Sequence, residues 1–384
     1  MNYDLIIGRY GEIALKSPRV RKRFENKLVA NIKSALDCKL NLNQARLFIY
    51  PKDFEEGLKT LSRIFGIVSY SPAISLKTDL VNIEKYLIDY VDELEKSGLF
   101  NSQKSFAIRT RRVGKHDMSS QEFSAFAGSV VVKKTGSPVN LRNPDITIFL
   151  EIRGEDTYIF HEKMKGTGGL PLGTQGRLVA LVSSGIDSPV ASYLMMKRGC
   201  EVVAIHFNND PFAGSMVTEN FKKLITQLNK YAVGSEIKKV IVDYGEYLAA
   251  SKEHAPEKLT CVLCKSGMYK IAERIAEKEN ASAIVDGSSL GQVASQTLPN
   301  IVATREKTNL PILSPLIGLD KVEIEKIAKK IGTFPISELN DGGCSAVPKY
   351  PETNADLVQV NTFKESMNQN EEVDKIINKL YPSI

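Results

Sequence analysis

A serine-rich loop at residues 183–188 has the composition of a phosphate-binding turn. It reads Ser183-Ser184-Gly185-Ile186-Asp187-Ser188 and follows the apolar run that ends at Leu181 and Val182. Gly185 lets the backbone approach a ligand closely. Ser188 before Pro189 predicts a helix N-cap and first helical residue, and the free N–H groups of a helix start bind anions. Asp187 is unfavourable beside bare phosphates, so we expect Mg²⁺ to bridge them.

The type of phosphate chemistry is narrowed by a motif that the sequence lacks. No glycine-spaced loop closes with Gly-Lys-Ser or Gly-Lys-Thr, which argues against kinase-like handling of a γ-phosphate. The loop therefore predicts cleavage of ATP between its α- and β-phosphates. Taken alone, it is also compatible with an ordinary serine-rich turn between a strand and a helix.

Three of the five cysteines lie where thiol chemistry is expected. Cys261 and Cys264 are three residues apart and precede a predicted helix, and Cys344 lies in the glycine-rich stretch Asp341-Gly342-Gly343-Cys344-Ser345. The thiolate is the nucleophilic form of cysteine. Cys38 and Cys200 are predicted to be inert, and the four histidines are too scattered to indicate zinc.

Charge is distributed unevenly along the chain. The net charge is +6, and the whole positive excess lies within residues 1–165. A basic group gathers around one predicted strand end, formed by Lys104, Arg109, Arg111, Arg112 and Lys115. Such residues bind RNA phosphates, and the absence of a stacking-aromatic motif favours recognition of RNA shape. A solvated basic surface is the alternative.

The elements that must position these residues fall into three groups. Residues 3–74 read strand, helix, strand, helix, strand, which suits a small α+β sandwich. Residues 81–161 hold a helix, a strand with the basic group, a second helix and a hairpin. After the glycine-rich stretch at 166–173, short β-rich runs at 179–182, 202–206, 239–242 and 283–285 alternate with helices, which predicts a parallel sheet with crossover helices. One of those helices is expected to begin at Gly267.

The first residues and the cysteine content indicate a cellular compartment. Residues 1–9 lack the layout of a signal peptide, and no apolar run is long enough for a transmembrane helix. We therefore expect a cytoplasmic protein with reduced thiols and no membrane partner.

The loop resembles the Ser-Gly-Gly-x-Asp-Ser motif of the PP-loop ATP pyrophosphatases. Gly168–Gly173 before it, and the run from Asp286 to Thr297 (DGSSLGQVASQT), resemble the tRNA 4-thiouridine synthetase family, also called the ThiI family. Ser184 stands where that family has glycine. The resemblance covers essentially the whole chain and implies an α/β PP-loop domain at 166–384, after a ferredoxin-like domain at 1–57 and a THUMP RNA-binding domain at 58–165.

The resemblance also implies the residues of an ATP site. Besides Ser183, Gly185 and Ser188, the positions that match are Leu181, Val182, His206, Phe207, Lys265, Gly287 and Gln296. The implied reaction transfers AMP to the O4 of uridine 8 in tRNA and replaces that oxygen with sulfur, with ATP and Mg²⁺ as cofactors. A second implied activity is sulfur transfer to the sulfur carrier protein of thiamine synthesis.

The source of the sulfur is left open by the sequence. Longer relatives carry a rhodanese domain, which these 384 residues do not include. One reading is that a cysteine desulfurase loads a persulfide on Cys344, which Cys261 or Cys264 resolves as a disulfide. The other is that Cys261, Cys264 and Cys344 hold an iron–sulfur cluster. The resemblance further implies that two subunits cooperate on the tRNA.

Two other functions remain open at this stage. The chain could be a tRNA-binding protein whose ATP loop has decayed, with Ser184 as the sign. It could also be a PP-loop thiolase that acts on another tRNA base, although the run at 286–297 argues against this.

Overall fold

The computed structural model describes residues 1–339 and 342–382, and Asp341 of the glycine-rich stretch therefore lies outside the described residues. The chain divides into two compact units, and each is described by itself. Unit 1 comprises Met1–Arg21 and Ile32–Gly168, and unit 2 comprises Lys22–Asn31 and Gly169–Ile384. Among the described residues, no helix has the length and apolar character needed to cross a membrane.

The first part of unit 1 has the order expected of a ferredoxin-like domain, with one more strand than predicted. In chain order the elements are β1 (Leu5–Tyr10), α1 (Pro18–Ala35), β2 (Cys38–Asn43), β3 (Arg46–Pro51), α2 (Phe54–Leu61) and β4 (Ile67–Lys77). The middle of α1, Lys22–Asn31, is assigned to unit 2. Strand β2 was missed because its alternate residues are exposed and half-buried, so no apolar run marks it. It pairs with β3 in antiparallel register from Cys38↔Pro51 to Asn43↔Arg46.

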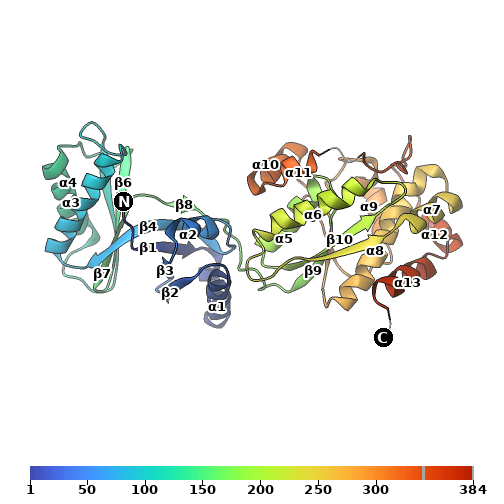
Figure 1. Ribbon diagram of the computed structural model, residues 1–384, viewed down its shortest axis with the longest axis horizontal. Helices are drawn as coiled ribbons and strands as arrows, with labels where there is room; N and C mark the ends of the chain where they lie inside the picture. Colours follow the sequence, from blue (N-terminus) through green and yellow to red (C-terminus); the bar gives the residue numbers. More distant parts are fainter. Residues whose placement is uncertain (340–341, 383–384) are drawn as a thin grey trace. The chain divides into compact units, whose positions relative to one another are not determined.

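The second part of unit 1 continues the same sheet. Its elements are α3 (Leu80–Lys96), β5 (Phe106–Val113), α4 (Ser120–Thr135), β6 (Ile146–Arg153), β7 (Asp156–Phe160) and β8 (Met164–Lys165). The strand order is β2-β3-β1-β4-β7-β6-β5, with β8 paired to β4 (Figure 1). Helices α3 and α4 share an apolar core with alternate residues of β5 and β6, including Ile108, Ile148 and Leu150.

The long strand β4 belongs to both parts. Its first half pairs with β1, from Ile67 to Ala73, and its second half pairs with β7, from Ile74 to Lys77. A second core, formed by residues such as Leu5, Ile7, Phe48, Tyr158 and Phe160, brings the faces of β1, β3 and β7 together. The boundary proposed between residues 57 and 58 lies within α2 and stays a proposal.

Unit 2 contains the predicted parallel sheet. Strands β9 (Arg177–Leu181), β10 (Glu201–Asn208), β11 (Lys238–Asp243), β12 (Ile284–Val285) and β13 (Ile312–Leu313) lie in the order β11-β10-β9-β12-β13. The helices are α5 (Asp187–Lys197), α6 (Ser215–Asn229), α7 (Gly245–His254), α8 (Thr260–Lys278), α9 (Leu298–Arg305), α10 (Lys321–Ile331), α11 (Phe334–Ser337), α12 (Leu357–Ser366) and α13 (Gln369–Leu380). The order reverses at β9, and ligands bind at the carboxyl ends of strands at such a switch point. The predicted fold class is confirmed.

Candidate functional site: a nucleotide pocket beside three thiols

The loop between β9 and α5 is held closed by two serines. The N–H of Ser183 donates to Oγ of Ser188 at 2.9 Å, and the two hydroxyl oxygens lie 3.1 Å apart. The N–H of Gly185 donates to Oγ of Ser183 at 3.3 Å. The predicted N-cap role of Ser188 is wrong, because α5 begins at Asp187 with Ile186 at the N-cap position and no side-chain cap. The hydroxyl of Ser188 shapes the loop instead.

Asp187 is engaged by two side chains that the sequence did not single out. Lys321 Nζ lies 2.8 Å from Oδ1 of Asp187, and Nε2 of Gln292 donates to Oδ2 at 2.9 Å. Within the described part of the chain, no group of three or more His, Cys, Asp or Glu residues could hold a metal ion. Mg²⁺ is often bound by one carboxylate together with substrate phosphates, so a single Asp187 fits an ion that arrives with ATP.

Two adjacent cavities open beside the loop. The first has a volume of about 280 Å³ and is lined by Leu181, Val182, Ser183, Ser184, His206, Phe207, Asn209, Ala213, Val217, Met268, Gly343 and Cys344. The second has a volume of about 180 Å³ and is lined by Leu181, Ser183, Asp187, Ser188, Lys265, Met268, Tyr269, Asp286, Gly287, Ser288 and Gln296. Leu181, Ser183 and Met268 line both. The structure therefore gathers all the predicted ATP-site residues around these cavities except Gly185.

His206 is held rigidly behind the first cavity. Its ring is buried and stacks on Phe221, with centroids 4.7 Å apart. Nδ1 lies 3.1 Å from the carbonyl oxygen of Val182, and Nε2 lies 3.3 Å from Oγ1 of Thr218. Burial lowers the pKa of His206 despite the bond to Val182. A neutral imidazole can hold the end of β9 in place through Val182, but it cannot form an ion pair with a phosphate.

Lys265 is the cation of the second cavity, and a buried carboxylate stands near it. Burial lowers the pKa of Lys265, whereas Asp286 raises it. Asp286 is buried and accepts hydrogen bonds from Arg305 at 2.9 Å, from Ser314 at 2.7 Å and from Tyr269. This network was not predicted, because its members lie in separate parts of the sequence. It fixes the end of β12, where the run at 286–297 begins.

Gly287 packs directly against the phosphate-binding loop. A Cβ at this position would lie 2.8 Å from the backbone nitrogen of Ser188 and 3.0 Å from the carbonyl carbon of Asp187, so no other residue fits without moving the loop. Gly185 differs, because a Cβ there would meet only Oγ of Ser183, at 3.5 Å. Neither Ser184 nor Gly185 has a positive φ. The backbone at Ser184 therefore does not require glycine.

The three cysteines lie close enough for their charges to interact. Helix α8 begins at Thr260, so the prediction that Cys261 and Cys264 precede the helix is wrong: they lie in its first turns. Burial raises the pKa of both thiols, Lys265 lowers it, and the charge of Cys344 raises it further. Nδ2 of Asn209 lies 3.9 Å from Sγ of Cys344, and the Cys344 backbone forms an isolated bridge with Ala213. Cys344 thus joins the lining of the first cavity.

The predicted basic group is only partly free to bind RNA. Arg109, Arg111 and Lys115 are exposed, although Arg109 also donates to the carbonyl oxygen of Leu141 at 2.5 Å. Lys104 is half-buried and donates to the carbonyl oxygens of Leu99 at 2.6 Å and Gly98 at 3.4 Å, just after α3. Arg112 is half-buried and donates to His116 O at 3.4 Å. The first three are therefore the better candidates for phosphate contacts.

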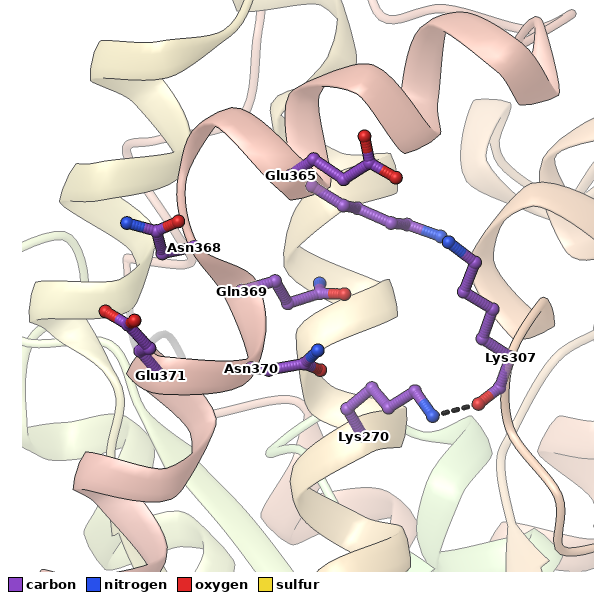
Figure 2. A pocket seen from close by; sticks show the side chains of 8 residues that line it. Lys270, Lys307, Glu365, Asn368, Gln369, Asn370 and Glu371 are labelled. Carbon is purple, nitrogen blue, oxygen red and sulfur yellow. Dashed lines mark hydrogen bonds between the residues drawn. The ribbon is translucent and has the colours of Figure 1, made fainter.

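A larger cavity of about 520 Å³ lies elsewhere in unit 2, and none of the predicted site residues lines it. Figure 2 shows Lys270, Gln369 and Asn370 reaching toward its centre, and Lys270 donates to the carbonyl oxygen of Lys307. Lys364 also lines it; it is 4% exposed and donates to the carbonyl oxygen of Ala303 at 3.0 Å. Burial is the main reason that the pKa of Lys364 falls to about 8.

A serine-rich loop at the switch point of a parallel sheet, in a chain whose other unit begins with a ferredoxin-like order of elements, defines a PP-loop protein. Three protein-family models match the chain: "Thiamine biosynthesis protein (ThiI)" at residues 173–369, "ThiI ferredoxin-like domain" at 5–71 and "THUMP domain" at 84–162. A probable tRNA sulfurtransferase of Methanobrevibacter smithii is 60% identical over 380 residues, covering 99% of this chain and 100% of the relative. The chain belongs to the ThiI family of tRNA sulfurtransferases.

Other relatives agree with this assignment. A probable tRNA sulfurtransferase of Methanothermobacter thermautotrophicus is 57% identical over 379 residues, covering 99% of this chain and 97% of the relative. Among solved structures, a 4-thiouridine synthetase in complex with RNA and bound ATP has a TM-score of 0.89 and 31% identity, covering 100% of this chain and 98% of that chain.

Proposed function

We propose that this chain is an ATP-dependent tRNA sulfurtransferase that converts uridine 8 of tRNA to 4-thiouridine. The observation that carries the proposal is the pair of adjoining cavities, one lined by Ser183, Asp187, Lys265 and Gly287 and the other by Cys344. This arrangement supports nucleotide activation and thiol chemistry at one site. The ATP-bound structural relative supports ATP as the nucleotide.

The first step activates a poor leaving group. The uracil O4 attacks the α-phosphorus of ATP, an O–P bond forms, the bond to the β-phosphate breaks, and pyrophosphate leaves. We assign Ser183, Gly185, Ser188 and Lys265 to the phosphates, where donors and a cation stabilise the developing charge. Leu181, Val182, His206, Phe207 and Gln296 would bind the nucleoside, and Asp187 would bind Mg²⁺ with the phosphates.

The second step brings in sulfur. A persulfide on Cys344 attacks C4 of the activated uracil, a C–S bond forms and AMP leaves with the former O4. The thiolate of Cys261 or Cys264 then attacks Sγ of Cys344, releases the thiolated base and leaves a disulfide. A thiol reductant then reduces this disulfide to two thiols, and a cysteine desulfurase reloads Cys344 with a persulfide. Cys344 lines the first cavity together with Met268 of α8, the helix that carries Cys261 and Cys264, and this supports the pairing.

An iron–sulfur cluster held by Cys261, Cys264 and Cys344 is the second proposal for the sulfur source. Three neighbouring thiols suit a cluster with one open position. The described residues, 1–339 and 342–382, do not arrange them as a metal-holding group, so we derive no step through a cluster. Iron and sulfide analysis after anaerobic purification separates the two proposals, because the persulfide route needs no iron.

The partners follow from the substrate. The THUMP match and the RNA-bound relative support tRNA as a partner of unit 1, with Arg109, Arg111 and Lys115 as phosphate contacts and Lys104 and Arg112 behind them. A homodimer that shares one tRNA, and a cytoplasmic location, stay predictions. The description of the matching family model supports a second acceptor, the sulfur carrier protein of thiamine synthesis.

The two alternatives can be tested in the same assay. A decayed loop is disfavoured because Ser183 and Ser188 still close it, and a thiolase acting on another tRNA base is disfavoured by the run at 286–297. The assay supplies ATP, Mg²⁺, cysteine, a desulfurase and a tRNA transcript, and measures pyrophosphate and thiolated nucleoside. A transcript with cytidine at position 8 is the control. Thiolation of both transcripts, or none with the uridine-8 transcript, would refute the proposed function.

A further inference from the structure

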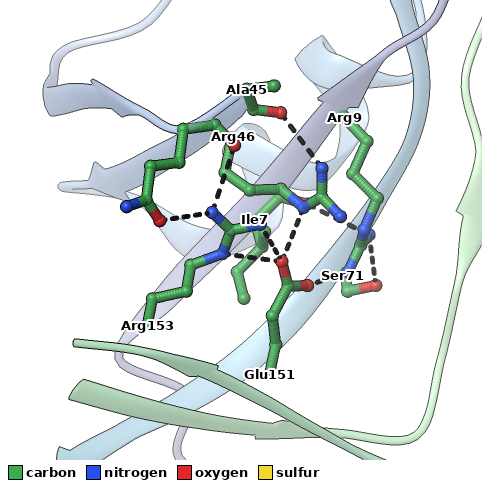
Figure 3. Close-up of polar contacts among 8 residues, drawn as sticks. Ile7, Arg9, Ala45, Arg46, Ser71, Glu151 and Arg153 are labelled. Carbon is green, nitrogen blue, oxygen red and sulfur yellow. Dashed lines mark hydrogen bonds and ion pairs between the residues drawn. The ribbon is translucent and has the colours of Figure 1, made fainter. Parts of the chain in front are cut away.

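One carboxylate in unit 1 is surrounded by three arginines. Glu151 on β6 is 3% exposed, and its oxygens lie 2.7 Å from Nε of Arg46, 2.6 Å from an Nη of Arg153 and 3.7 Å from an Nη of Arg9. Figure 3 shows the guanidinium groups converging on this side chain from three strands. The cluster therefore holds an uncompensated positive charge in a buried place.

Further cations extend the cluster toward solvent. Arg111 on β5 is the direct sheet partner of Glu151 on β6, and it is exposed. Lys163 is exposed as well, and its Nζ lies 3.5 Å from the centroid of the Phe149 ring. The guanidinium of Arg9 lies 4.8 Å from the centroid of Phe160, which stacks on Phe149 at 5.1 Å. Each of the two stacked phenylalanine rings is thus in contact with one cation.

The cations of this cluster outnumber its carboxylates, so an anion would be attracted to it. Within the described ranges, Lys163 makes no ion pair, and Glu151 is shared by three arginines. Burial lowers the pKa of Arg9 to about 10 even though Glu151 opposes the shift. Guanidinium groups bind phosphate oxygens in a bidentate manner, and aromatic rings position such cations at little entropic cost.

We propose that Arg9, Arg111 and Lys163, backed by the Glu151 cluster, form a binding site for a backbone phosphate of the RNA substrate. Glu151 is a positioning residue, because it holds the buried arginines without reaching the phosphate itself. The proposal rests on the proposed function only in taking tRNA as the bound RNA. Two of these three residues, Arg9 and Lys163, lie outside the basic group that the sequence indicates.

The test compares Lys163→Met with Lys59→Met in the full chain. Methionine keeps an apolar side chain over Phe149 and removes the charge, whereas Lys59 is a 60% exposed lysine already paired with Glu56. Affinity for an unmodified tRNA transcript is measured at several KCl concentrations. We expect Lys163→Met to weaken binding about threefold to tenfold and to lower the slope of log affinity against log salt by about 1. Lys59→Met should match the wild type, and Lys163→Arg should restore the slope.

Several outcomes would overturn the proposal. These are an unchanged slope in Lys163→Met, an equal loss in Lys59→Met, or a loss in Lys163→Arg as large as in Lys163→Met. The double variant Lys163→Met/Arg111→Met should lower the slope by about 2, since two phosphate contacts are lost. If the wild type binds tRNA but does not thiolate it, the proposed function is refuted. The slopes of log affinity against log salt would still show whether the phosphate site exists.

Discussion

Lys321 Nζ lies 2.8 Å from Oδ1 of Asp187, and this ion pair joins the first residue of α10 to the first residue of α5. A lysine in the first helical turn is unfavourable for the helix dipole. The contact with Asp187, and not the dipole of α10, therefore explains why a lysine stands at position 321. An incoming phosphate or Mg²⁺ competes for the same two groups, so the pair is expected to rearrange when ATP binds.

Removal of either charge should impair adenylation. We expect Asp187→Asn to abolish pyrophosphate release and Lys321→Met to slow it about 100-fold, because a positioned charge near the transferred phosphorus is lost. Both variants should retain tRNA affinity, measured with the same transcript. Lys326→Met, on the exposed side of α10, is the matched control. Turnover that persists in Asp187→Asn would show that its assigned role is wrong.

Two glycines near the loop should respond differently to alanine. In Gly287→Ala the new methyl group meets the backbone of Ser188 at 2.8 Å, so the loop must shift and ATP affinity should fall at least tenfold. Gly185→Ala has room within the chain, and the protein should melt at the wild-type temperature. If Gly185→Ala also keeps full ATP affinity by calorimetry, the ligand does not approach that residue.

Strands β9 to β12 of unit 2 were predictable because each is a short β-rich run between helices, whereas β13 (Ile312–Leu313) is only two residues long and was not predicted. Strand β2 was missed, since its polar residues are exposed and the apolar residues that alternate with them are only half-buried. The start of α8 was also missed, because its N-cap residue, Leu259, provides no side-chain cap. Neither feature is marked by a long apolar run or by a capping side chain.

The site could be predicted only where a motif marks it. The loop and the run at 286–297 indicated the residues that line the two cavities. Gln292 lies within that run, but its contact with Asp187, 105 residues away in sequence, could not be foreseen, and neither could that of Lys321, which is 134 residues away. Such pairs depend on how the helices pack, which a single sequence does not reveal.

Substitution of Cys344 should separate the two half-reactions. We expect Cys344→Ser to release pyrophosphate in the presence of tRNA and to form no 4-thiouridine, because activation does not need the thiol. Cys200→Ser, at a buried cysteine elsewhere in unit 2, is the control and should keep both activities. Loss of pyrophosphate release in Cys344→Ser would place the thiol in the activation step. Iron bound by the wild type but not by Cys261→Ser would contradict the persulfide route.

Lys364 should make the stability of the protein depend on pH. Its pKa is about 8 when folded and has its ordinary, higher value when unfolded, so the unfolded chain binds more protons above pH 8. Stability should therefore rise as the pH increases through this range. Lys364→Met should be more stable than the wild type at pH 7, by about 2 kcal/mol, and the difference should shrink above pH 8. Urea denaturation at pH 7 and pH 9.5 measures this, and a constant difference would contradict it.

Strand β4 prevents the first two domains from moving independently, because its two halves pair with strands of different domains. Eleven residues of one continuous strand serve both parts of the eight-stranded sheet, so the domains share a strand instead of being joined by a linker. A chain cut after residue 57 would leave the β1-facing half of that strand as an open edge, which invites association with other strands. The first two domains should therefore be expressed, or moved into another protein, only as a pair.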